Sequence, residues 1–148
     1  MTEDIGNRII ENVLVDAHGD WNDHTFITIT VPANMWLSSN DRRYWADKAR
    51  KTKLLRALGF FEARNQARGL RFERANVSVA VAYPRNGRAD PPNSYPTVKA
   101  ILDGFTDAHL WDDDDSEHVV KTSFTRHPEP TRQKGVHVLY FHLTGVIA

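Results

Sequence analysis

The chain has no cysteine among its 148 residues, which excludes disulfide bonds, thiolate zinc sites and cysteine nucleophiles. It has no run of apolar residues near the roughly 20 that a membrane-spanning helix needs, so we expect no membrane partner. Its first residues lack a basic segment followed by an apolar one. With no signal peptide predicted, we expect a cytoplasmic location. The sequence also lacks a P-loop, a dinucleotide-binding fingerprint and a recognisable Ser/His/Asp motif.

The formal net charge is zero, but the charges are unevenly distributed along the chain. Between Asp41 and Asn76 there are eleven Lys or Arg residues against four Asp or Glu residues. Between Asp103 and Glu117 there are seven acidic residues and no Lys or Arg. A basic surface beside a concentrated acidic site suits a protein that holds a polyanion. Two solvated surfaces of opposite sign would give the same counts.

Hydrophobic periodicity and turn residues predict alternating strands and helices. The predicted elements are a strand over 25–31, a helix over 42–66 that is broken or continuous near Gly59, one strand or a strand pair over 70–83, a helix over 95–108, and strands over 117–126 and 136–146. Residues 1–23 are expected to form an N-terminal arm or an extra strand. We therefore predict that residues 1–148 form one domain of the α/β or α+β class, with a mixed sheet and two main helices.

Apolar and aromatic residues outline the expected core. The stripe of the first helix should contain Trp45, Ala49, Leu54, Leu55, Leu58 and Phe61, with Phe60 beside it. We expect Trp36, Trp45 and Trp111 to anchor the core rather than to stack on bases. His137 and His142 stand at odd spacing on a predicted strand, so they should face opposite sides and not form a ligand pair.

Four consecutive aspartates, Asp112 to Asp115, follow Leu110 and Trp111. Like charges this close raise one another's pKa unless a cation or basic groups compensate. Hard divalent cations such as Mg²⁺ prefer carboxylate oxygens. An EF-hand counted from Asp112 would need glycine and glutamate where Glu117 and Ser123 stand, which argues against that calcium loop. A metal site and a solvated acidic turn both remain open from the run itself.

The helix over 95–108 places further polar residues near this run. Lys99 and Asp103 are one turn apart and lie off the apolar stripe, so both can point toward a common site. An ordinary surface ion pair is the alternative. Asp90 and Asn93 lie in the loop before the helix, and the aspartates lie just past its end. This arrangement favours a single site built around the helix.

The residues of this site resemble those of a known family. The matching segments are Arg88–Asn93 (RADPPN), Pro96–Lys99 (PTVK), Asp103-Gly104, Leu110-Trp111 and Asp113-Asp114. They resemble the RusA family of Holliday junction resolvases, and especially the RusA-like proteins of actinobacterial phages and prophages. Residues 37–42 (LSSNDR) with Trp45 also resemble a segment of those phage relatives, so the likeness extends from about Leu37 to Val120.

The resemblance implies a RusA-like fold, a homodimer, Mg²⁺ or Mn²⁺ as cofactor, and nicking of four-way DNA junctions in recombination and repair. Asp90 matches the family's first loop aspartate, which helps to bind the catalytic metal. Asn93 matches the asparagine that follows it, and Lys99 matches the active-site lysine.

Asp113 and Asp114 match the paired aspartates after the helix, of which Asp114 is the better candidate for the essential metal ligand. Asp103 matches a helix aspartate that is either structural or part of the site. Pro92 stands where the family has a second loop aspartate, and the helix begins after three extra residues. Either Asp103 or an extra aspartate of the 112–115 run replaces the missing carboxylate, or activity is reduced.

The basic residues of the first helix are the candidate DNA-backbone surface, which predicts binding that weakens with salt. They are Arg42, Arg43, Lys48, Arg50, Lys51, Lys53 and Arg56. The main hypothesis is a metal-dependent endonuclease acting on branched DNA. One alternative is a catalytically impaired RusA-like protein that only binds branched DNA. The other is an acidic metal-binding or interaction domain without a DNA role.

Overall fold

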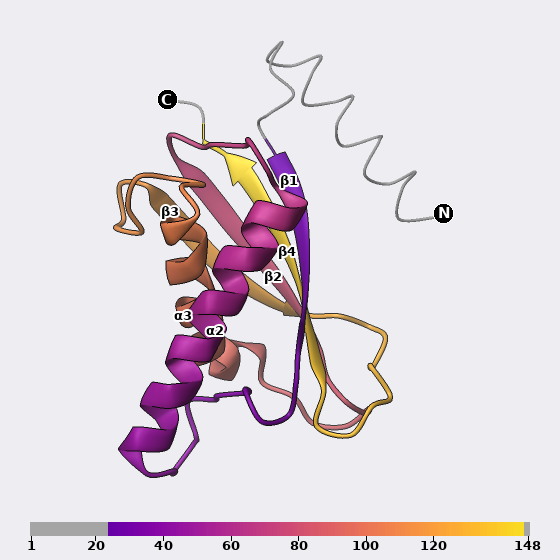
Figure 1. Ribbon diagram of the computed structural model, residues 1–148. Coiled ribbons are helices and arrows are strands. Elements are labelled where there is room, and N and C mark those ends of the chain that lie inside the picture. The colour runs from indigo at the N-terminus through magenta and orange to yellow at the C-terminus, as the bar shows by residue number, and fades with distance from the viewer. Residues whose placement is uncertain (1–23, 147–148) are drawn as a thin grey trace.

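A mixed four-stranded sheet with two α-helices makes up the fold, as the computed structural model of the protein shows (Figure 1). The structure describes residues 24–146, so the arm or extra strand predicted for residues 1–23 lies outside the described residues. The elements are β1 (His24–Val31), α2 (Trp45–Gln66), β2 (Ala75–Ala82), the short 3₁₀ helix η2 (Pro91–Ser94), α3 (Tyr95–Asp107), β3 (Val119–Arg126) and β4 (His137–Gly145).

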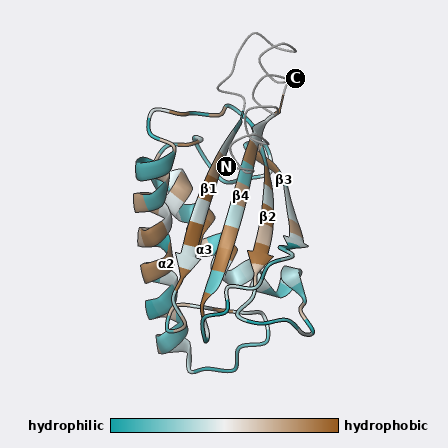
Figure 2. Cartoon of the chain, turned by 90° about the vertical axis from the view of Figure 1, so that its right-hand side faces the viewer, coloured by the Kyte–Doolittle hydropathy of each residue, from teal (hydrophilic) through white to brown (hydrophobic). Residues whose placement is uncertain are grey.

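The strands lie in the order β1-β4-β2-β3. Strand β4 is antiparallel to both β1 and β2, whereas β2 and β3 are parallel. Parallel strands need a crossover connection, and the segment containing η2 and α3 provides it. Both helices lie on one face of the sheet (Figure 2). The predicted α/β domain with a mixed sheet and two main helices is therefore confirmed.

Alternation along the strands explains which face of the sheet carries the helices. The buried positions are Ile27, Ile29 and Val31 in β1, Val77, Val79 and Val81 in β2, and Leu139, Phe141 and Leu143 in β4. His137 is buried on this alternation and His142 is only partly buried, so the two histidines face opposite sides, as predicted. Trp111 is fully buried and Trp36 packs against the core, which confirms two of the three predicted anchors.

Helices α2 and α3 cross in close backbone contact at two glycines. A methyl group added at Gly59 would overlap the carbonyl oxygen of Ile101, and one added at Gly104 would overlap that of Arg56. Helix α2 runs unbroken through Gly59. Gly59 therefore serves the helix crossing and does not interrupt the helix.

The predicted stripe of α2 is largely wrong. The buried residues follow a four-residue spacing instead: Lys51, Leu55, Gly59 and Ala63. Trp45 is 71% exposed and Phe61 is 66% exposed, so neither anchors the core. The reason is the close crossing with α3, which favours small side chains along the contact line and leaves several large ones outside.

Several element boundaries also differ from those expected. The predicted strand or strand pair over 70–83 is one strand that begins only at Ala75. The preceding residues form a connection instead, in which the backbone N–H of Phe72 donates to the carbonyl of Leu110 at 2.7 Å. The helix over 95–108 ends one residue earlier than predicted, and the last two strands begin one or two residues later.

His137 makes stability sensitive to acid. Its ring stacks on Trp36, with centroids 3.6 Å apart and planes at 2°. Burial lowers the pKa of His137 to about 4, from the 6.5 of a free histidine. The unfolded chain therefore takes up a proton at this residue below pH 6.5, and the folded chain takes it up only near pH 4. Its contribution to stability is complete above pH 6.5 and falls as the pH drops toward 4.

We expect His137→Phe to remove this part of the acid sensitivity while keeping the stacking on Trp36. Urea unfolding at pH 7, 5.5 and 4.5 would show a smaller loss of unfolding free energy in the variant than in the wild type. Identical pH profiles for the two proteins would contradict the assignment.

Candidate active site

Lys99 lies between two carboxylates that come from different parts of the chain. Its ammonium donates to Asp103 Oδ1 at 2.6 Å and also to Asp114 Oδ2. Lys99 and Asp103 are one turn apart on α3, and Asp114 lies in the turn that follows the helix. The Lys99 side chain is 42% exposed, and both carboxylates are about one quarter exposed at 26% and 27%. The predicted convergence of these three residues is therefore present.

A buried tryptophan fixes the turn that carries Asp114. The Trp111 ring is fully buried and its indole N–H donates to Thr106 Oγ1 at 2.7 Å. His109 reverses the chain direction after the helix with φ of 65°. The backbone carbonyl of Leu110 then accepts from Phe72. These contacts tie the acidic run to the end of α3 and to the core.

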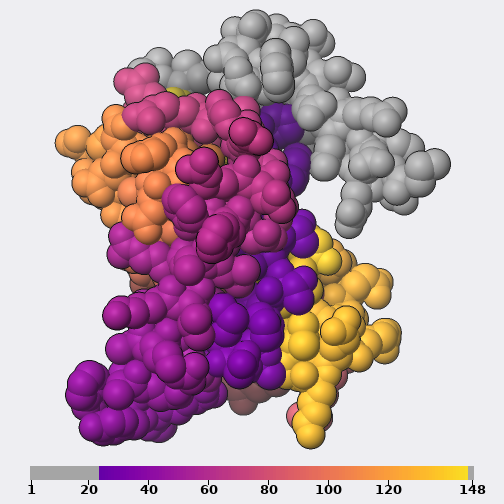
Figure 3. Space-filling model, viewed as in Figure 1, coloured from indigo at the N-terminus to yellow at the C-terminus, as the bar shows by residue number. Residues whose placement is uncertain are grey.

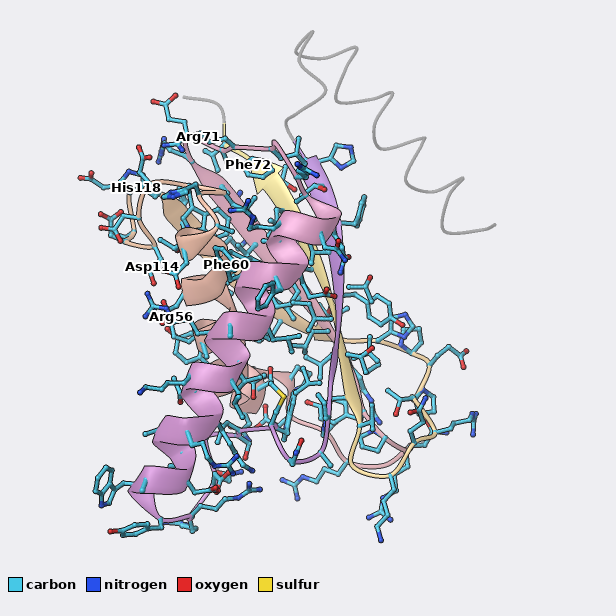
Figure 4. The ribbon with its side chains drawn as sticks, in the orientation of Figure 1. Arg56, Phe60, Arg71, Phe72, Asp114 and His118 are labelled. Carbon is cyan, nitrogen blue, oxygen red and sulfur yellow. The ribbon has the colours of Figure 1, made fainter. Side chains whose placement is uncertain are left out.

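The four consecutive aspartates have four different partners. Asp112 pairs with Arg71, Asp113 accepts the backbone N–H of Asp114 at 2.7 Å, and Asp115 pairs with the imidazole of His118 at 2.6 Å. Figure 4 labels Arg71, Asp114 and His118 around this turn. Only Asp114 contacts Lys99. The four carboxylates of the run therefore have different surroundings.

The ionisation of the three site residues is interdependent. Burial raises the pKa of Asp103, and its hydrogen bond to Asp114 adds to the rise. The same hydrogen bond from Asp103, with that from Lys99, lowers the pKa of Asp114 to about 2. Burial lowers the pKa of Lys99, but the hydrogen bonds to the two carboxylates outweigh it, so the pKa is raised. At neutral pH Lys99 is cationic and Asp114 is anionic.

Asp90 and Asn93 form a second group of polar residues. Asn93 Nδ2 donates to Asp90 Oδ2 at 3.2 Å. The backbone N–H of Ser39 donates to the Asn93 carbonyl at 2.8 Å, which brings residues 38–40 beside this loop. Together they line a polar pocket of about 590 Å³, whose wall consists of Trp36, Ser38, Asn40, Tyr83, Arg88, Ala89, Asp90, Asn93 and Ser94.

This pocket joins the two chain segments that carry the family resemblance. Leu37 is fixed to α3 because the fully buried Thr97 Oγ1 accepts its N–H at 2.8 Å and donates to its carbonyl at 2.7 Å. No hydrogen bond or ion pair within residues 24–146 joins Asp90 to Lys99, Asp103 or Asp114. In the same residues, no group of three or more acidic or histidine side chains is close enough to hold a metal ion. The residues of the predicted site thus form two hydrogen-bonded groups. One is Asp90 with Asn93 before α3, and the other is Lys99 with Asp103 and Asp114.

The basic residues predicted to bind DNA lie on α2 and just before it. Most of them already pair with an acidic residue, bond to a backbone carbonyl or are buried. Arg43 and Arg50 both pair with Asp47, at 3.7 Å and 2.7 Å. The Lys48 ammonium donates to the Asp41 carbonyl at 2.7 Å. Lys51 is only 3% exposed, so the prediction that it lies on the DNA-binding surface is wrong. Lys51 is buried because it lies on the line of α2 that packs inward.

The other three residues of the predicted DNA-binding set differ from one another. Arg42 and Lys53 are exposed, and neither forms an ion pair with any residue that the structure describes. Arg56 makes two hydrogen bonds to the Asp107 carboxylate, at 2.6 and 2.8 Å. These bonds raise the pKa of Arg56, and the negative charges of Asp103 and Asp114 raise it further.

Arg56 is therefore a second cation at the acidic pair. Figure 4 shows the Arg56 side chain pointing from helix α2 toward Asp114. Its membership in the site depends on the helix crossing at Gly104, for which the local sequence gives no signal.

Comparison with known proteins gives no identification, since no protein-family model and no curated protein matches the chain. Neither of the two long helices in residues 24–146 is long and apolar enough to cross a membrane.

Proposed function

We propose that this chain is a Mg²⁺-dependent endonuclease, similar to the RusA family, that resolves four-way DNA junctions by paired nicking. The observation that carries the proposal is the group of Lys99, Asp103 and Asp114 at the end of α3. A lysine between two partly exposed carboxylates brings a phosphate-binding cation and metal-binding oxygens to one place. Proposed action on intracellular DNA fits the expected cytoplasmic location.

The acidic pair fits the requirements of Mg²⁺ or Mn²⁺. Magnesium is commonly held by one or two carboxylates together with several waters. Asp103 and Asp114 are two neighbouring carboxylates, and the raised pKa of Asp103 reflects the cost of burying it beside a second acid. A divalent cation would relieve that cost. Asp103 and Asp114 would hold the metal, with Asp113 and Asp90 as the further ligands that the resemblance implies.

The chain's own residues have separate roles in this proposal. When bound, the metal would supply charge neutralisation on the phosphate and a more acidic water. The exposed part of the Lys99 ammonium would contact the scissile phosphate, and its charge holds the two carboxylates together. Burial and the neighbouring Asp114 raise the pKa of Asp103, so its carboxylate is the costlier of the two to keep ionised and gains most from a bound cation. Arg56 lies beside this group, with its charge already paired to Asp107.

The missing loop carboxylate at Pro92 has a replacement in this proposal. Asp103 lies in the group with Lys99 and Asp114, whereas Asp112 and Asp115 pair elsewhere. We therefore assign the compensating role to Asp103. Symmetrical cutting of a junction also needs two active sites, so the proposal requires a homodimer. A monomer in sedimentation analysis would count against resolvase activity.

A junction cleavage assay tests the proposed function. We expect the wild-type protein to introduce paired nicks into a labelled four-way junction with Mg²⁺ or Mn²⁺, and none with chelator. A linear duplex of the same sequence is the control and should remain uncut. Junction binding without cleavage in either metal would favour the catalytically impaired binding protein instead. One observation favours that second candidate. Within residues 24–146, no hydrogen bond or ion pair joins Asp90 to the group of Lys99, Asp103 and Asp114.

A further inference from the structure

A basic hollow lies between two loops at one end of the sheet. It has a volume of about 750 Å³ and is lined by Pro84, Arg85, Asn86, Arg132, Lys134 and Gly135. The loops follow β2 and β3, and both lie at the lower right in Figure 1. In Figure 3 the loop before β4, in yellow, projects from the body of the molecule. No acidic residue lines this hollow.

The three cations of the hollow are available to a ligand. Among the residues that the structure describes, none of the ion pairs involves Arg85, Arg132 or Lys134. Each of the three is exposed to solvent. On helix α2, by contrast, Arg50 pairs with Asp47 and Arg56 pairs with Asp107.

The two loops hold each other in place. The backbone N–H groups of Thr131 and Arg132 donate to the carbonyls of Tyr83 and Pro84, at 2.8 and 2.9 Å. The Arg126 guanidinium donates to the Gly87 carbonyl at 2.5 Å and lies 5.4 Å from the Tyr83 ring centroid. The basic residues are thus carried by backbone that is already ordered, which reduces the entropy lost on binding.

Arg132 adopts an unusual backbone conformation. Its φ is 60°, in the left-handed region that residues other than glycine and asparagine rarely adopt. Such backbone outliers concentrate at functional sites, where the surrounding structure maintains them. From this position Arg132 lines the hollow and contributes one of its three cations.

The hollow and the Asp90 pocket both share lining residues with a third hollow between them in sequence. A smaller hollow lined by Tyr83 to Arg88 shares Pro84, Arg85 and Asn86 with the basic hollow. It also shares Tyr83 and Arg88 with the pocket that contains Asp90. Several cations spread over neighbouring hollows along one loop suit a polymer of phosphates better than a single small anion.

We propose that Arg85, Arg132 and Lys134 bind the phosphate backbone of one duplex arm of the DNA substrate. This inference rests on the proposed function, because it assigns a surface to the same substrate. It places the main electrostatic contacts on the loops beside Asp90, and not on helix α2.

The test is metal-free DNA binding as a function of salt. The triple variant Arg85→Gln/Arg132→Asn/Lys134→Gln removes the three charges, and asparagine tolerates the backbone conformation at position 132. Fluorescence anisotropy with a labelled four-way junction in chelator, from 50 to 200 mM salt, gives the slope of log K against log salt. Each lost phosphate contact reduces that slope by about 0.9, so we expect a reduction of about 2.7.

A matched variant removes the same charge from α2 and the segments on either side of it. Arg42→Gln/Lys53→Gln/Arg68→Gln changes three exposed cations, and we expect it to reduce the slope by less than about 1. A slope that is unchanged in the loop variant, or that falls only in the α2 variant, would overturn the inference. The single variant Lys134→Gln guards against misfolding of the triple variant and should reduce the slope by about 0.9.

The outcomes separate this inference from the proposed function. If the wild-type protein cleaves junctions but the loop variant keeps the full salt slope, the inference is wrong and the nuclease proposal stands. If the loop variant loses the slope while the wild-type protein cleaves nothing, the binding surface stands and the nuclease proposal is wrong.

Discussion

We expect Asp114→Asn to reduce Mg²⁺-dependent junction cleavage by at least about a thousandfold, which corresponds to about 4 kcal/mol of transition-state stabilisation. The Asp114 carboxylate contacts the Lys99 ammonium, and its pKa is lowered to about 2. It is therefore ionised near neutral pH, as a metal ligand must be. The amide has nearly the same shape but binds a divalent cation weakly. Single-turnover cleavage of a labelled junction with Mg²⁺ measures the effect.

Junction binding without metal should move in the other direction. Removing a negative charge from the site reduces its repulsion of DNA phosphates, so Asp114→Asn should bind the junction in chelator as tightly as the wild type or more tightly. Asp112→Asn is the matched control, since it makes the same change two residues earlier. Its carboxylate is 68% exposed and pairs with Arg71, so we expect cleavage within about twofold of wild type. Full cleavage by Asp114→Asn would refute the assignment.

The core of the candidate site could be predicted because its parts are close in sequence. Lys99 and Asp103 are one helical turn apart, and the turn length fixed by Trp111 returns Asp114 to them. The different partners of the four aspartates could not be predicted. Arg71 pairs with Asp112 and His118 pairs with Asp115. Which carboxylate each side chain reaches depends on the backbone path of the turn, which the sequence pattern does not give.

The sheet was predictable for a similar reason, and the surface of α2 was not. Alternating apolar residues in β1, β2 and β4 directly determine which face is buried. Helix α2 carries large apolar residues on several sides, so its periodicity does not identify the packed face. The decisive contact is the approach of Gly59 to α3, which involves backbone atoms only. The position of Lys51 on the buried line follows from that approach.

The basic loops show a second limit of sequence reasoning. Arg85 and Arg132 are far apart in the chain, and neither lies in a charge run. They meet because β2 and β3 are parallel neighbours whose ends point the same way, and because Arg132 donates its N–H to the Pro84 carbonyl. A charge count along α2 identifies many cations but does not show which are already paired. Pairing, and not number, decides which cations remain for a phosphate backbone.

We expect Gly104→Ala to destabilise the fold by about 3 kcal/mol or more, which would lower the melting temperature by about 10 °C in a chain of this size. In an ordinary helix interior the same substitution stabilises by about 1 kcal/mol. Here the added methyl group would overlap the Arg56 carbonyl and lie 2.6 Å from the Phe60 nitrogen. Both atoms belong to the backbone of α2, so no side-chain rotation relieves the overlap. The helices must separate instead.

Gly69→Ala separates this steric effect from a general intolerance of glycine replacement. Gly69 has φ of 79° and open space around its Cα, so its replacement costs only the backbone preference, about 1 kcal/mol. Urea unfolding should therefore give a much lower free energy of unfolding for Gly104→Ala than for Gly69→Ala. If the two variants lose equal stability, the crossing is not in close contact. Gly104 also follows Asp103 directly and touches the backbone of Arg56. Separation of the helices should therefore weaken the Arg56–Asp107 pair and move a cation away from the proposed catalytic carboxylates.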